Sequence, residues 1–344
     1  MIDPEKGQNS FDRFTKTMYT IKELQSLISC EIDKEINQLY KTEPKNLYEP
    51  VGYALEMGGK RLRPVMVLLS YNLFSKTIEN AYTVALAIEV FHNFTLLHDD
   101  IMDQAEMRRN SLSVYKKYSE NIAILSGDAM SIMAYNYLLK CNVSDPAPMI
   151  HLFSQTALEV CEGQQLDMDF ESRMDVSIPE YMSMIRLKTA VLLGCSLKIG
   201  ALAADAPEKT ASLLYAFGLN LGIAFQLQDD LLDVFADQDK FGKKIGGDIV
   251  SNKKTFLLLK ALELSDDNTK KIIQDWITKK EFDVEEKIMV FTEIYNNLKI
   301  KEITETYINR FYQSAMSIHE EIDLVRESKN ELLHFANLIM NRDH

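Results

Sequence analysis

Apolar residues recur at three- and four-residue spacing along almost the whole chain, which is the period of an amphipathic helix. Almost no segment alternates between apolar and polar residues as a strand does. Within residues 81–103, for example, Val84, Ala87, Ile88 and Phe91 follow the helical spacing. The pattern predicts an all-α protein of at least about ten helices. Further stretches with this period are 20–40, 121–140, 147–170, 179–204, 209–235, 253–264 and 284–327.

Two of these stretches contain segments, 190–204 and 213–232, that are apolar on nearly every face, which predicts burial at the centre of the fold. Pro179 follows a short polar stretch and precedes a glutamate, a pattern typical of a helix start. No linker, fixed-period repeat or change of composition marks a domain boundary. We therefore expect a loose polar leader over residues 1–18 and a single domain over residues 19–344.

The composition narrows the possible partners. Of 344 residues, 38 are Lys or Arg and 51 are Asp or Glu, so the formal net charge is −13. An acidic chain lacks the basic face that general nucleic-acid binding requires. The N-terminal residues contain no apolar signal-peptide core, and the most apolar stretch, 190–204, is short and carries Lys198, so we expect no membrane span. The four cysteines show no paired spacing, which favours a reducing, cytoplasmic compartment over a disulfide or zinc framework.

Two acidic triplets of the form Asp-Asp-x-x-Asp each close a strongly apolar helix. They are Asp99, Asp100 and Asp103, and Asp229, Asp230 and Asp233. The first and last aspartates of each triplet lie on one helix face, with Cβ atoms about 5–6 Å apart. Like charges at this spacing, at a helix end where the macrodipole disfavours negative charge, are destabilising unless a cation lies between them. Carboxylate oxygens that leave coordination positions open suit a Mg²⁺ ion that also binds a substrate phosphate. A Ca²⁺ site is less favoured, because the loop spacing and glycine of an EF-hand are absent. The alternative for each triplet is an acidic helix end exposed to solvent.

Basic residues and glycines accompany both triplets. The glycine pair at 58–59 lies near Arg63, and a second glycine cluster within 242–247 contains Lys243. Glycine permits unusual backbone dihedrals and close approach of the backbone to an anion, so these segments fit phosphate binding. Ordinary connecting loops with solvated charges are the alternative. Lys188 differs from the other basic residues because a charge within a very apolar helix requires a partner.

Seven motifs in this order resemble those of the all-trans polyprenyl diphosphate synthases, and the resemblance covers residues 45–260. They are GGKRLRP at 58–64, HDDIMDxxxxRR at 98–109, LSGD at 125–128, GQQLDM at 163–168, KT at 188–189, FQLQDDLLD at 225–233 and GKxxGGDIxxNKKT at 242–255. An ordered set of this size is far more specific than either acidic triplet alone.

The resemblance implies a short-chain enzyme of the farnesyl or geranylgeranyl diphosphate synthase type. It implies the isoprenoid synthase type I fold, a single-domain antiparallel helical bundle around a deep central cavity, usually as a homodimer, with the two aspartate helices facing each other across its mouth. Three Mg²⁺ ions would assemble with the substrate diphosphate. The metal ligands that the resemblance implies are Asp99, Asp103, Asp229, Asp230 and Asp233.

The same resemblance assigns substrate contacts. Isopentenyl diphosphate would be bound by Lys60, Arg63, His92 and Arg109. The allylic diphosphate would be held by Arg108, Lys188 and Lys243, and Lys253 would also bind substrate. The implied catalytic set is Asp99, Asp100, Asp103, Lys188, Thr189, Gln226 and Asp229. Without the resemblance, His92 on an apolar helix is typical of a satisfied core histidine.

The implied reaction is head-to-tail prenyl transfer. Dimethylallyl, geranyl or farnesyl diphosphate ionises with the help of Mg²⁺, isopentenyl diphosphate attacks the allylic carbon, and a proton is lost. Thr189 and Gln226 would stabilise the cation by oriented dipoles. A class I terpene cyclase would replace the second aspartate triplet with an Asn/Asp-Ser/Thr-Glu triad, which is absent after Phe225. A head-to-head condensing enzyme would show Asp-x-x-x-Asp motifs, and a non-catalytic partner subunit would have no reason to keep both triplets.

Product length depends on the helix before the first triplet. A helix rises about 5.4 Å per turn, close to one isoprene unit, so a growing tail that follows this helix meets its side chains in order. We expect Phe94 with Thr95 to form the floor, with Phe91 beneath and the small Ala87 further on, and we favour a twenty-carbon product. The alternative is that Phe94 only packs the core. One departure from the family pattern is Asn110 in place of a common glycine; asparagine tolerates left-handed backbone, so the turn can survive.

Overall fold

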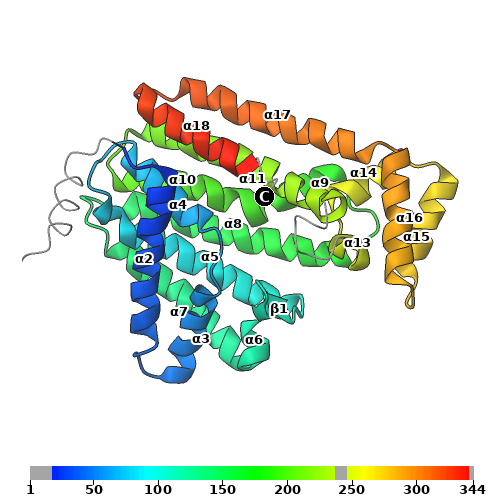
Figure 1. Cartoon of the computed structure of the whole chain (residues 1–344), viewed down its shortest axis with the longest axis horizontal. Helices are drawn as coiled ribbons and strands as arrows, with labels where there is room; N and C mark the ends of the chain where they lie inside the picture. Colours follow the sequence, from blue (N-terminus) through cyan, green and yellow to red (C-terminus); the bar gives the residue numbers. More distant parts are fainter. Residues whose placement is uncertain (1–17, 237–245, 341–344) are drawn as a thin grey trace, which may run out of the picture. The chain divides into compact units, whose positions relative to one another are not determined.

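The computed structural model describes residues 18–236 and 246–340, and these are almost entirely helical (Figure 1). The prediction of an all-α protein is confirmed. Within the described residues, strands are confined to one antiparallel pair, β1 (Met107–Arg108) and β2 (Ser111–Leu112). The leader expected over residues 1–18 lies outside the described residues, apart from Met18.

The chain divides into two compact units. The first comprises Met1–Gln155, Cys195–Tyr215 and Ile322–Leu332, and the second comprises Thr156–Gly194, Ala216–Glu321 and Leu333–His344. The division falls within four helices, α8 (Ala147–Glu171), α10 (Val191–Ala203), α11 (Glu208–Phe235) and α18 (Arg326–Met340). The single domain expected over residues 19–344 stays a prediction.

In the first unit, the first aspartate triplet lies at the end of α5, and α5 is held by α4 and α7. A capping box starts α2, because Thr20 and Glu23 each accept the other's backbone N–H with a side-chain oxygen. α2 then packs against α3 and α4 (Figure 1). The helices are α2 (Ile21–Leu39), α3 (Lys45–Glu56), α4 (Leu62–Asn72), η1 (Ile78–Ala81), α5 (Tyr82–Met102), α6 (Val114–Lys117) and α7 (Glu120–Leu139).

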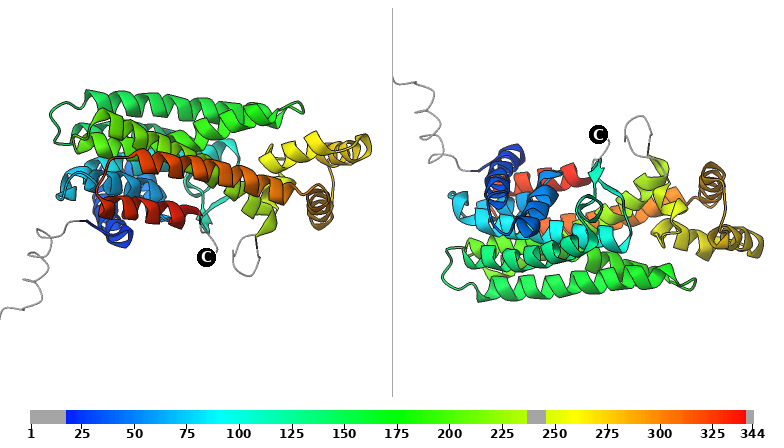
Figure 2. Two further views of the ribbon diagram at one scale, coloured as in Figure 1. Left: turned by 90° about the horizontal axis from the view of Figure 1, so that it is seen from above. Right: turned by 90° about the horizontal axis from the view of Figure 1, so that it is seen from below.

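In the second unit, α16 contacts α13, α15 and α17, and α14 contacts α9 and α17. Apolar residues from these helices and α11 form one core, which includes Leu227, Phe256 and Phe291. α17 and the last turns of α18 lie side by side (Figure 2), where the Tyr312 hydroxyl donates to Asn337 Oδ1 at 2.8 Å. The elements are α9 (Ile178–Ile185), the π-helical turn η2 (Arg186–Ala190), α13 (Gly247–Val250), α14 (Phe256–Leu264), α15 (Asp267–Thr278), α16 (Val284–Asn297) and α17 (Ile300–Glu321).

The helix boundaries differ from the sequence-based prediction in two places. The stretch 284–327 has helical period throughout, but it is interrupted between α16 and α17, where Lys299 adopts a left-handed φ of +55°, and again between Glu321 and Arg326. The stretch 179–204 contains the π-helical turn η2 between α9 and α10. The start near Pro179 is confirmed, because Ser177 and Glu180 form a capping box and the proline lies in the first turn of α9.

The most apolar segments, 190–204 and 213–232, are not exposed, as predicted, but α7 and α11, which contains 213–232, qualify by length and composition as possible membrane spans. Every residue of α10 is buried except Lys198 and Leu202, which are half-buried, and no residue of 213–232 is exposed. α7 and α11 are each long and apolar enough to cross a membrane, contrary to the expectation that no segment would be. The expectation assumed that a membrane span needs a long run of apolar residues without charges. A helix with a few charged residues can still have a high mean hydropathy. Of their most apolar windows, 39% and 50% is buried inside the protein, and the core helix of a globular protein passes the same test.

Candidate functional site

The first aspartate triplet lies at the C-terminal end of α5, where Asp99 and Asp100 occupy the last turn and Asp103 is the C-cap residue. Asp100 is buried, and its Oδ1 accepts hydrogen bonds from Arg108 Nε at 2.8 Å and Nη2 at 2.5 Å. The same Nη2 lies 3.5 Å from Asp99 Oδ2. The guanidinium therefore compensates the central carboxylate and reaches one outer carboxylate of the triplet.

Burial and ion pairing oppose each other in this pair. Burial raises the pKa of Asp100, while the hydrogen bond and charge of Arg108 act in the opposite direction. Burial alone lowers the pKa of Arg108, but the hydrogen bond and charge of Asp100, with Asp99 and Asp103, raise it overall. Arg108 was expected to hold a substrate diphosphate; in this structure its donors are directed to carboxylates.

Arg109 lies in the tight turn between β1 and β2. Arg109 and Asn110 have φ values of +52° and +62°, so both central residues of this two-residue hairpin are left-handed, as a type I′ turn requires. The expectation that Asn110 tolerates left-handed geometry is confirmed. Arg109 Nη1 donates to the carbonyl oxygen of Gly58, and a Cβ atom at Gly59 would lie 2.7 Å from Arg109 Cζ. The glycine loop thus gives room to this guanidinium.

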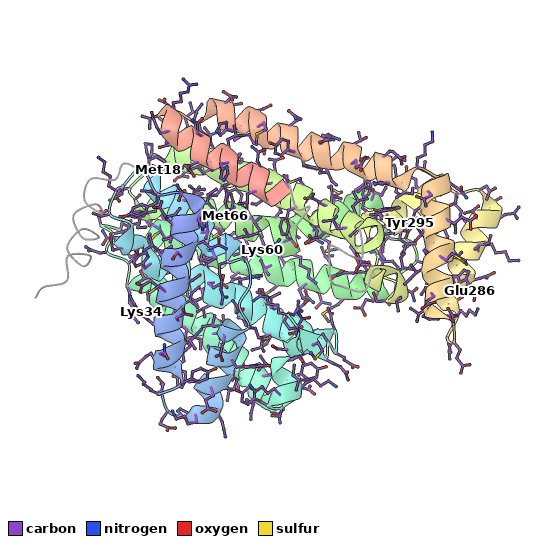
Figure 3. The ribbon with its side chains drawn as sticks, in the orientation of Figure 1. Met18, Lys34, Lys60, Met66, Glu286 and Tyr295 are labelled. Carbon is purple, nitrogen blue, oxygen red and sulfur yellow. The ribbon has the colours of Figure 1, made fainter. Side chains whose placement is uncertain are left out.

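The structure brings together two residues that the resemblance assigns to isopentenyl diphosphate. Arg63 Nη1 donates to His92 Nε2 at 3.2 Å. Burial, and then the charge of Arg63, lower the pKa of His92 well below its usual value, so its ring is neutral and can accept this hydrogen bond. Lys60 is exposed just before α4 (Figure 3), and its carbonyl oxygen accepts from Gln25 Nε2 at 3.0 Å.

Sequence analysis missed a buried network behind this loop. Arg61, with a left-handed φ of +50°, pairs with Glu89 and donates to the carbonyl oxygen of Leu55. Asn93 Nδ2 donates to Glu89 Oε1 at 2.9 Å. A glutamate at 89, within an otherwise apolar helix, was the available signal, because a buried charge requires a partner.

The residues expected to limit product length form an aromatic row on α5. Phe94 is half-buried, with its ring centroid 5.5 Å from that of Phe91 and 4.8 Å from that of His98. Phe91 is buried and meets Phe153 edge-on at 5.0 Å. The Thr95 hydroxyl is occupied locally, since it donates to the carbonyl oxygen of the residue three before it at 2.8 Å. Their role in chain length stays a prediction.

In the second unit, Lys188 has the partner that its apolar surroundings require. Its Nζ donates to Asp167 Oδ2 at 2.6 Å, and both side chains are largely buried. Lys188 lies in the π-helical turn η2, a distortion that is rare in helices and frequent at functional sites. A Cβ atom on Gly163 of α8 would lie 2.2 Å from the backbone nitrogen of Lys188, so only glycine fits there. Asp167 belongs to the GQQLDM motif at 163–168, and its pairing with Lys188 could not be inferred from the sequence alone.

A continuous hydrogen-bond chain joins the second triplet to this turn. The Thr189 hydroxyl donates to Gln226 Oε1 at 3.1 Å, and Gln226 Nε2 donates to Asp230 Oδ1 at 3.1 Å. The Tyr181 hydroxyl donates to Asp230 Oδ2, which also accepts the backbone N–H of Phe256 at 3.4 Å. Asp230 therefore accepts three protein donors, one at Oδ1 and two at Oδ2.

Burial shifts the titration of two carboxylates in this region. Burial raises the pKa of Asp230 to about 6, against the hydrogen bonds from Tyr181 and Gln226. Burial likewise raises the pKa of Asp248 to about 7, against the charge of Lys253. The backbone N–H of Asp248 donates to Asp233 Oδ2 at 2.9 Å. Burial raises the pKa of Tyr181 as well, so its hydroxyl stays protonated and keeps its donor role.

These side chains surround one cavity that encloses about 340 Å³, including the part open to solvent. Its wall combines cationic, acidic and neutral polar groups with an apolar floor. The lining residues are Asp167, Tyr181, Met184, Ile185, Lys188, Thr189, Gln226, Asp230, Lys253, Lys254 and Thr255. Five residues expected at the site, Lys188, Thr189, Gln226, Asp230 and Lys253, thus meet here, while Lys243 and Gly242 lie outside the described residues.

Among the described residues, no group of three or more His, Cys, Asp or Glu side chains is placed to hold a metal ion by itself. Mg²⁺ usually keeps several waters and takes only one or two carboxylates together with substrate phosphates. The hard oxygen donors of Asp99 and Asp103, one helical turn apart at the end of α5, fit such an ion.

Comparison with known proteins identifies the family. A family model described as polyprenyl synthetase matches residues 44–295. The chain is 36% identical over 317 residues to the geranylgeranyl diphosphate synthase of Sulfolobus acidocaldarius, covering 89% of this chain and 96% of that protein. The chain belongs to the polyprenyl synthetase family.

Further comparisons agree with this membership. A crystal structure of a geranylgeranyl pyrophosphate synthase is 44% identical and superposes with a TM-score of 0.89, covering 95% of this chain and all of that one. A relative from Natronomonas pharaonis, named geranylfarnesyl diphosphate synthase, is 39% identical over 242 residues, 65% of this chain and 71% of that protein. The resemblance found in the sequence is confirmed, and the protein is a prenyltransferase of the polyprenyl diphosphate synthase type.

Proposed function

We propose that this polyprenyl synthetase condenses isopentenyl diphosphate head-to-tail with allylic diphosphates and releases geranylgeranyl diphosphate. The observation that carries the proposal is the cavity in which Lys188, Thr189, Gln226 and Lys253 meet, because it offers cations for a diphosphate beside neutral oxygens for a carbocation. Its apolar floor, formed by Met184 and Ile185, excludes water that would quench the cation.

We propose Mg²⁺ as the cofactor, with Asp99, Asp103 and Asp229 as its principal ligands and Asp230 and Asp233 supporting the second site. Bound Mg²⁺ neutralises the negative charge that develops on the departing diphosphate. Asp230 already accepts three protein donors, so its part is to orient Gln226 and the end of α11.

The chain's own residues would then act in two ways. Lys188 and Lys253 hold the allylic diphosphate, and the pairing of Lys188 with Asp167 at 2.6 Å fixes the position of that amine. Thr189 and Gln226 present oxygen dipoles toward the ionised carbon. In the first unit, Arg63 and the neutral ring of His92 would bind isopentenyl diphosphate together with Lys60 and Arg109, with Arg108 and Asp100 as their neighbours.

The twenty-carbon product rests on the names of relatives and on the aromatic row of α5. Phe94, backed by Phe91, would stop a tail that runs along α5, whereas the name of the relative from Natronomonas pharaonis refers to geranylfarnesyl diphosphate, a longer product.

The proposal is tested by incubating the protein with labelled isopentenyl diphosphate, Mg²⁺ and, separately, dimethylallyl, geranyl and farnesyl diphosphates, and sizing the products by chromatography. We expect a twenty-carbon product from each starter, and longer products from Phe94→Ala because the floor is removed. Phe153→Leu, which changes an aromatic side chain behind the row, is the matched control and should keep the length. Absence of product from every starter contradicts the proposed function; unchanged length in Phe94→Ala contradicts the role of Phe94 alone.

We also propose a homodimer. An exposed apolar stripe on α7 supports it: Leu125, Ile132 and Leu139 are spaced seven residues apart and are 60%, 64% and 61% exposed. Such spacing places side chains on one helix face suited to another helix. Light scattering should give twice the chain mass for the wild type and the chain mass for Ile132→Glu; a monomeric wild type contradicts the proposal.

We propose a cytoplasmic location, supported by four cysteines that are all free thiols. Cell fractionation followed by the condensation assay tests this, and activity confined to the membrane pellet contradicts it.

A further inference from the structure

Lys287 on α16 is a fully buried lysine that none of the quoted motifs contains. α16 runs from the region of Glu286 to that of Tyr295, both labelled in Figure 3, and Lys287 lies in its first turn. No carboxylate within the described part of the chain lies at ion-pair distance from its ammonium group. Burying a charge without a counter-ion costs free energy, so the polar contacts of this ammonium group must offset that cost.

The ammonium group of Lys287 contacts one short segment. Its Nζ donates to Asn252 Oδ1 at 2.6 Å and to the carbonyl oxygen of Val250 at 3.3 Å, and it lies 4.3 Å from the ring centroid of Phe282. Burial lowers the pKa of Lys287, the direction expected when neutral groups alone surround an amine. All of its polar contacts thus fix the turn that follows α13.

Asn252 is the centre of that turn. Its φ is +58°, left-handed geometry that asparagine tolerates better than other non-glycine residues. Its Nδ2 donates to the carbonyl oxygen of Ile277 at the end of α15, at 3.2 Å, and its own carbonyl oxygen accepts from Lys254 Nζ at 3.3 Å. The side chain therefore links α15 and α16 to the turn, and Lys287 fixes which way the amide faces.

The next residue is Lys253, which lines the cavity. The backbone N–H of Lys253 donates to the carbonyl oxygen of Asp248 at 2.9 Å, and its carbonyl oxygen accepts the N–H of Thr255 at 2.9 Å. Its charge acts on both raised carboxylates, Asp230 and Asp248, whose pKa values it lowers. The place of this amine depends on the turn, because Lys253 directly follows the left-handed Asn252, whose conformation sets the direction of the chain at Lys253.

We propose that Lys287 is a positioning residue for prenyl transfer: by holding Asn252 in the left-handed turn, it places Lys253 at the wall of the diphosphate cavity. The inference rests on the proposed function, because it assigns Lys253 to the allylic diphosphate. Lys287 itself touches no substrate. Its effect on the reaction passes through Asn252 to Lys253.

Lys287→Met tests the proposal, because methionine keeps the length and burial of the side chain and removes its donor. We expect KM for the allylic substrate to rise about tenfold with kcat changed less than about threefold, since ground-state binding by Lys253 is weakened. The affinity for inorganic pyrophosphate with Mg²⁺ should fall by a similar factor. Backbone amides of Val250, Lys253 and Thr255 should exchange with solvent faster, while those of α17 remain as in the wild type.

A double variant separates positioning from general stability. If Lys287 acts through Lys253, then adding Lys287→Met to Lys253→Met produces no further rise in KM, whereas independent effects would multiply. Lys260→Met is the matched control, because Lys260 pairs with Glu263 on its own helix, away from the turn. Thr304→Val removes a buried hydrogen bond to the carbonyl oxygen of Ile300 and controls for lost stability. Both controls should keep KM.

Unchanged KM, pyrophosphate affinity and amide exchange in Lys287→Met would overturn the proposal, as would the same rise of KM in Thr304→Val. Failure of the proposed function is distinguishable from this outcome. If the wild type binds pyrophosphate but forms no prenyl product, the condensation is wrong, and pyrophosphate affinity with amide exchange still decides the role of Lys287.

Discussion

The two aspartate triplets share one sequence pattern, but the structure compensates their central carboxylates differently. Asp100 is bound by a cation, since Arg108 donates to it twice, at 2.8 and 2.5 Å. Asp230 is bound by neutral donors, the Tyr181 hydroxyl, the Gln226 amide and a backbone N–H. Both carboxylates are buried, with 2% and 5% of their surface exposed.

The difference shows that one motif can be stabilised by two kinds of chemistry. A guanidinium cancels the charge of Asp100, whereas dipoles cancel that of Asp230 only in part, and burial raises the pKa of Asp230 to about 6. In both triplets the central aspartate is committed to protein donors. Because the central aspartates accept protein donors, we propose the outer residues Asp99, Asp103 and Asp229 as the principal Mg²⁺ ligands.

The largest expected effect separates outer from central aspartates. Asp99→Asn and Asp229→Asn should each lower kcat about 10²–10³-fold, because each removes a carboxylate that we propose binds Mg²⁺. Their free energies of unfolding without Mg²⁺ should not fall, because each variant removes one charge from a pair of like charges. Steady-state assays with labelled isopentenyl diphosphate measure the first quantity and urea titrations the second. Wild-type activity in either variant would show that the outer carboxylates bind no essential ion.

A smaller effect distinguishes the two ways of compensating the central carboxylate. Arg108→Met leaves Asp100 buried without its cation and should lower the free energy of unfolding by about 3 kcal/mol. Tyr181→Phe removes one of several donors to Asp230 and should cost about 1–2 kcal/mol. Urea unfolding without Mg²⁺ measures both. The matched controls are Arg173→Met, at a surface ion pair, and Tyr135→Phe, at a hydroxyl pair of 3.2 Å, and each should cost less than its counterpart. An equal loss in Arg108→Met and Tyr181→Phe would contradict the comparison.

The smallest effect is a pH dependence at Asp230. Because the folded pKa of about 6 exceeds the unfolded value of 3.8, the folded state binds more protons between these values. Stability from this group is therefore fully present below about pH 4 and declines as the pH rises toward 6. Asp230→Asn should remove this decline. Between about pH 4 and 6, the free energy of unfolding of the wild type should therefore fall by on the order of 2 kcal/mol more than that of the variant. Urea titrations at several pH values without Mg²⁺ measure it; parallel profiles for variant and wild type would contradict the assignment.

Most of the fold could be predicted because helical period is strong in this chain. α5, α7, α8 and α11 begin and end within about two residues of the predicted stretches. The break before α17 could not be predicted, because the apolar spacing continues through Lys299, and only the left-handed backbone there separates two helices. The π-helical turn around Lys188 could not be predicted for a similar reason. The extra residue in a π-helical turn leaves the apolar character of the segment unchanged, so the sequence reads as a continuous helix.

The candidate site could be predicted where a residue's chemistry was unusual for its helix. Lys188 was expected to need a partner, and Asp167 supplies it. Tyr181 and Lys287 could not be assigned, because a tyrosine or a lysine on an amphipathic helix is ordinary until its neighbours across space are known. Arg108 shows the opposite limit, since its expected ligand is a phosphate while the structure directs its donors to Asp100.

Gly163 on α8 lies so close to the backbone of Lys188 that this position has no room for a side chain. A single methyl group there would come within 2.2 Å of a backbone nitrogen, so the smallest possible enlargement must displace the π-helical turn that carries Lys188. The steric requirement at this position is therefore the absence of a side chain. In a library that samples every residue along α8, position 163 should accept glycine alone, although glycine is a poor helix former.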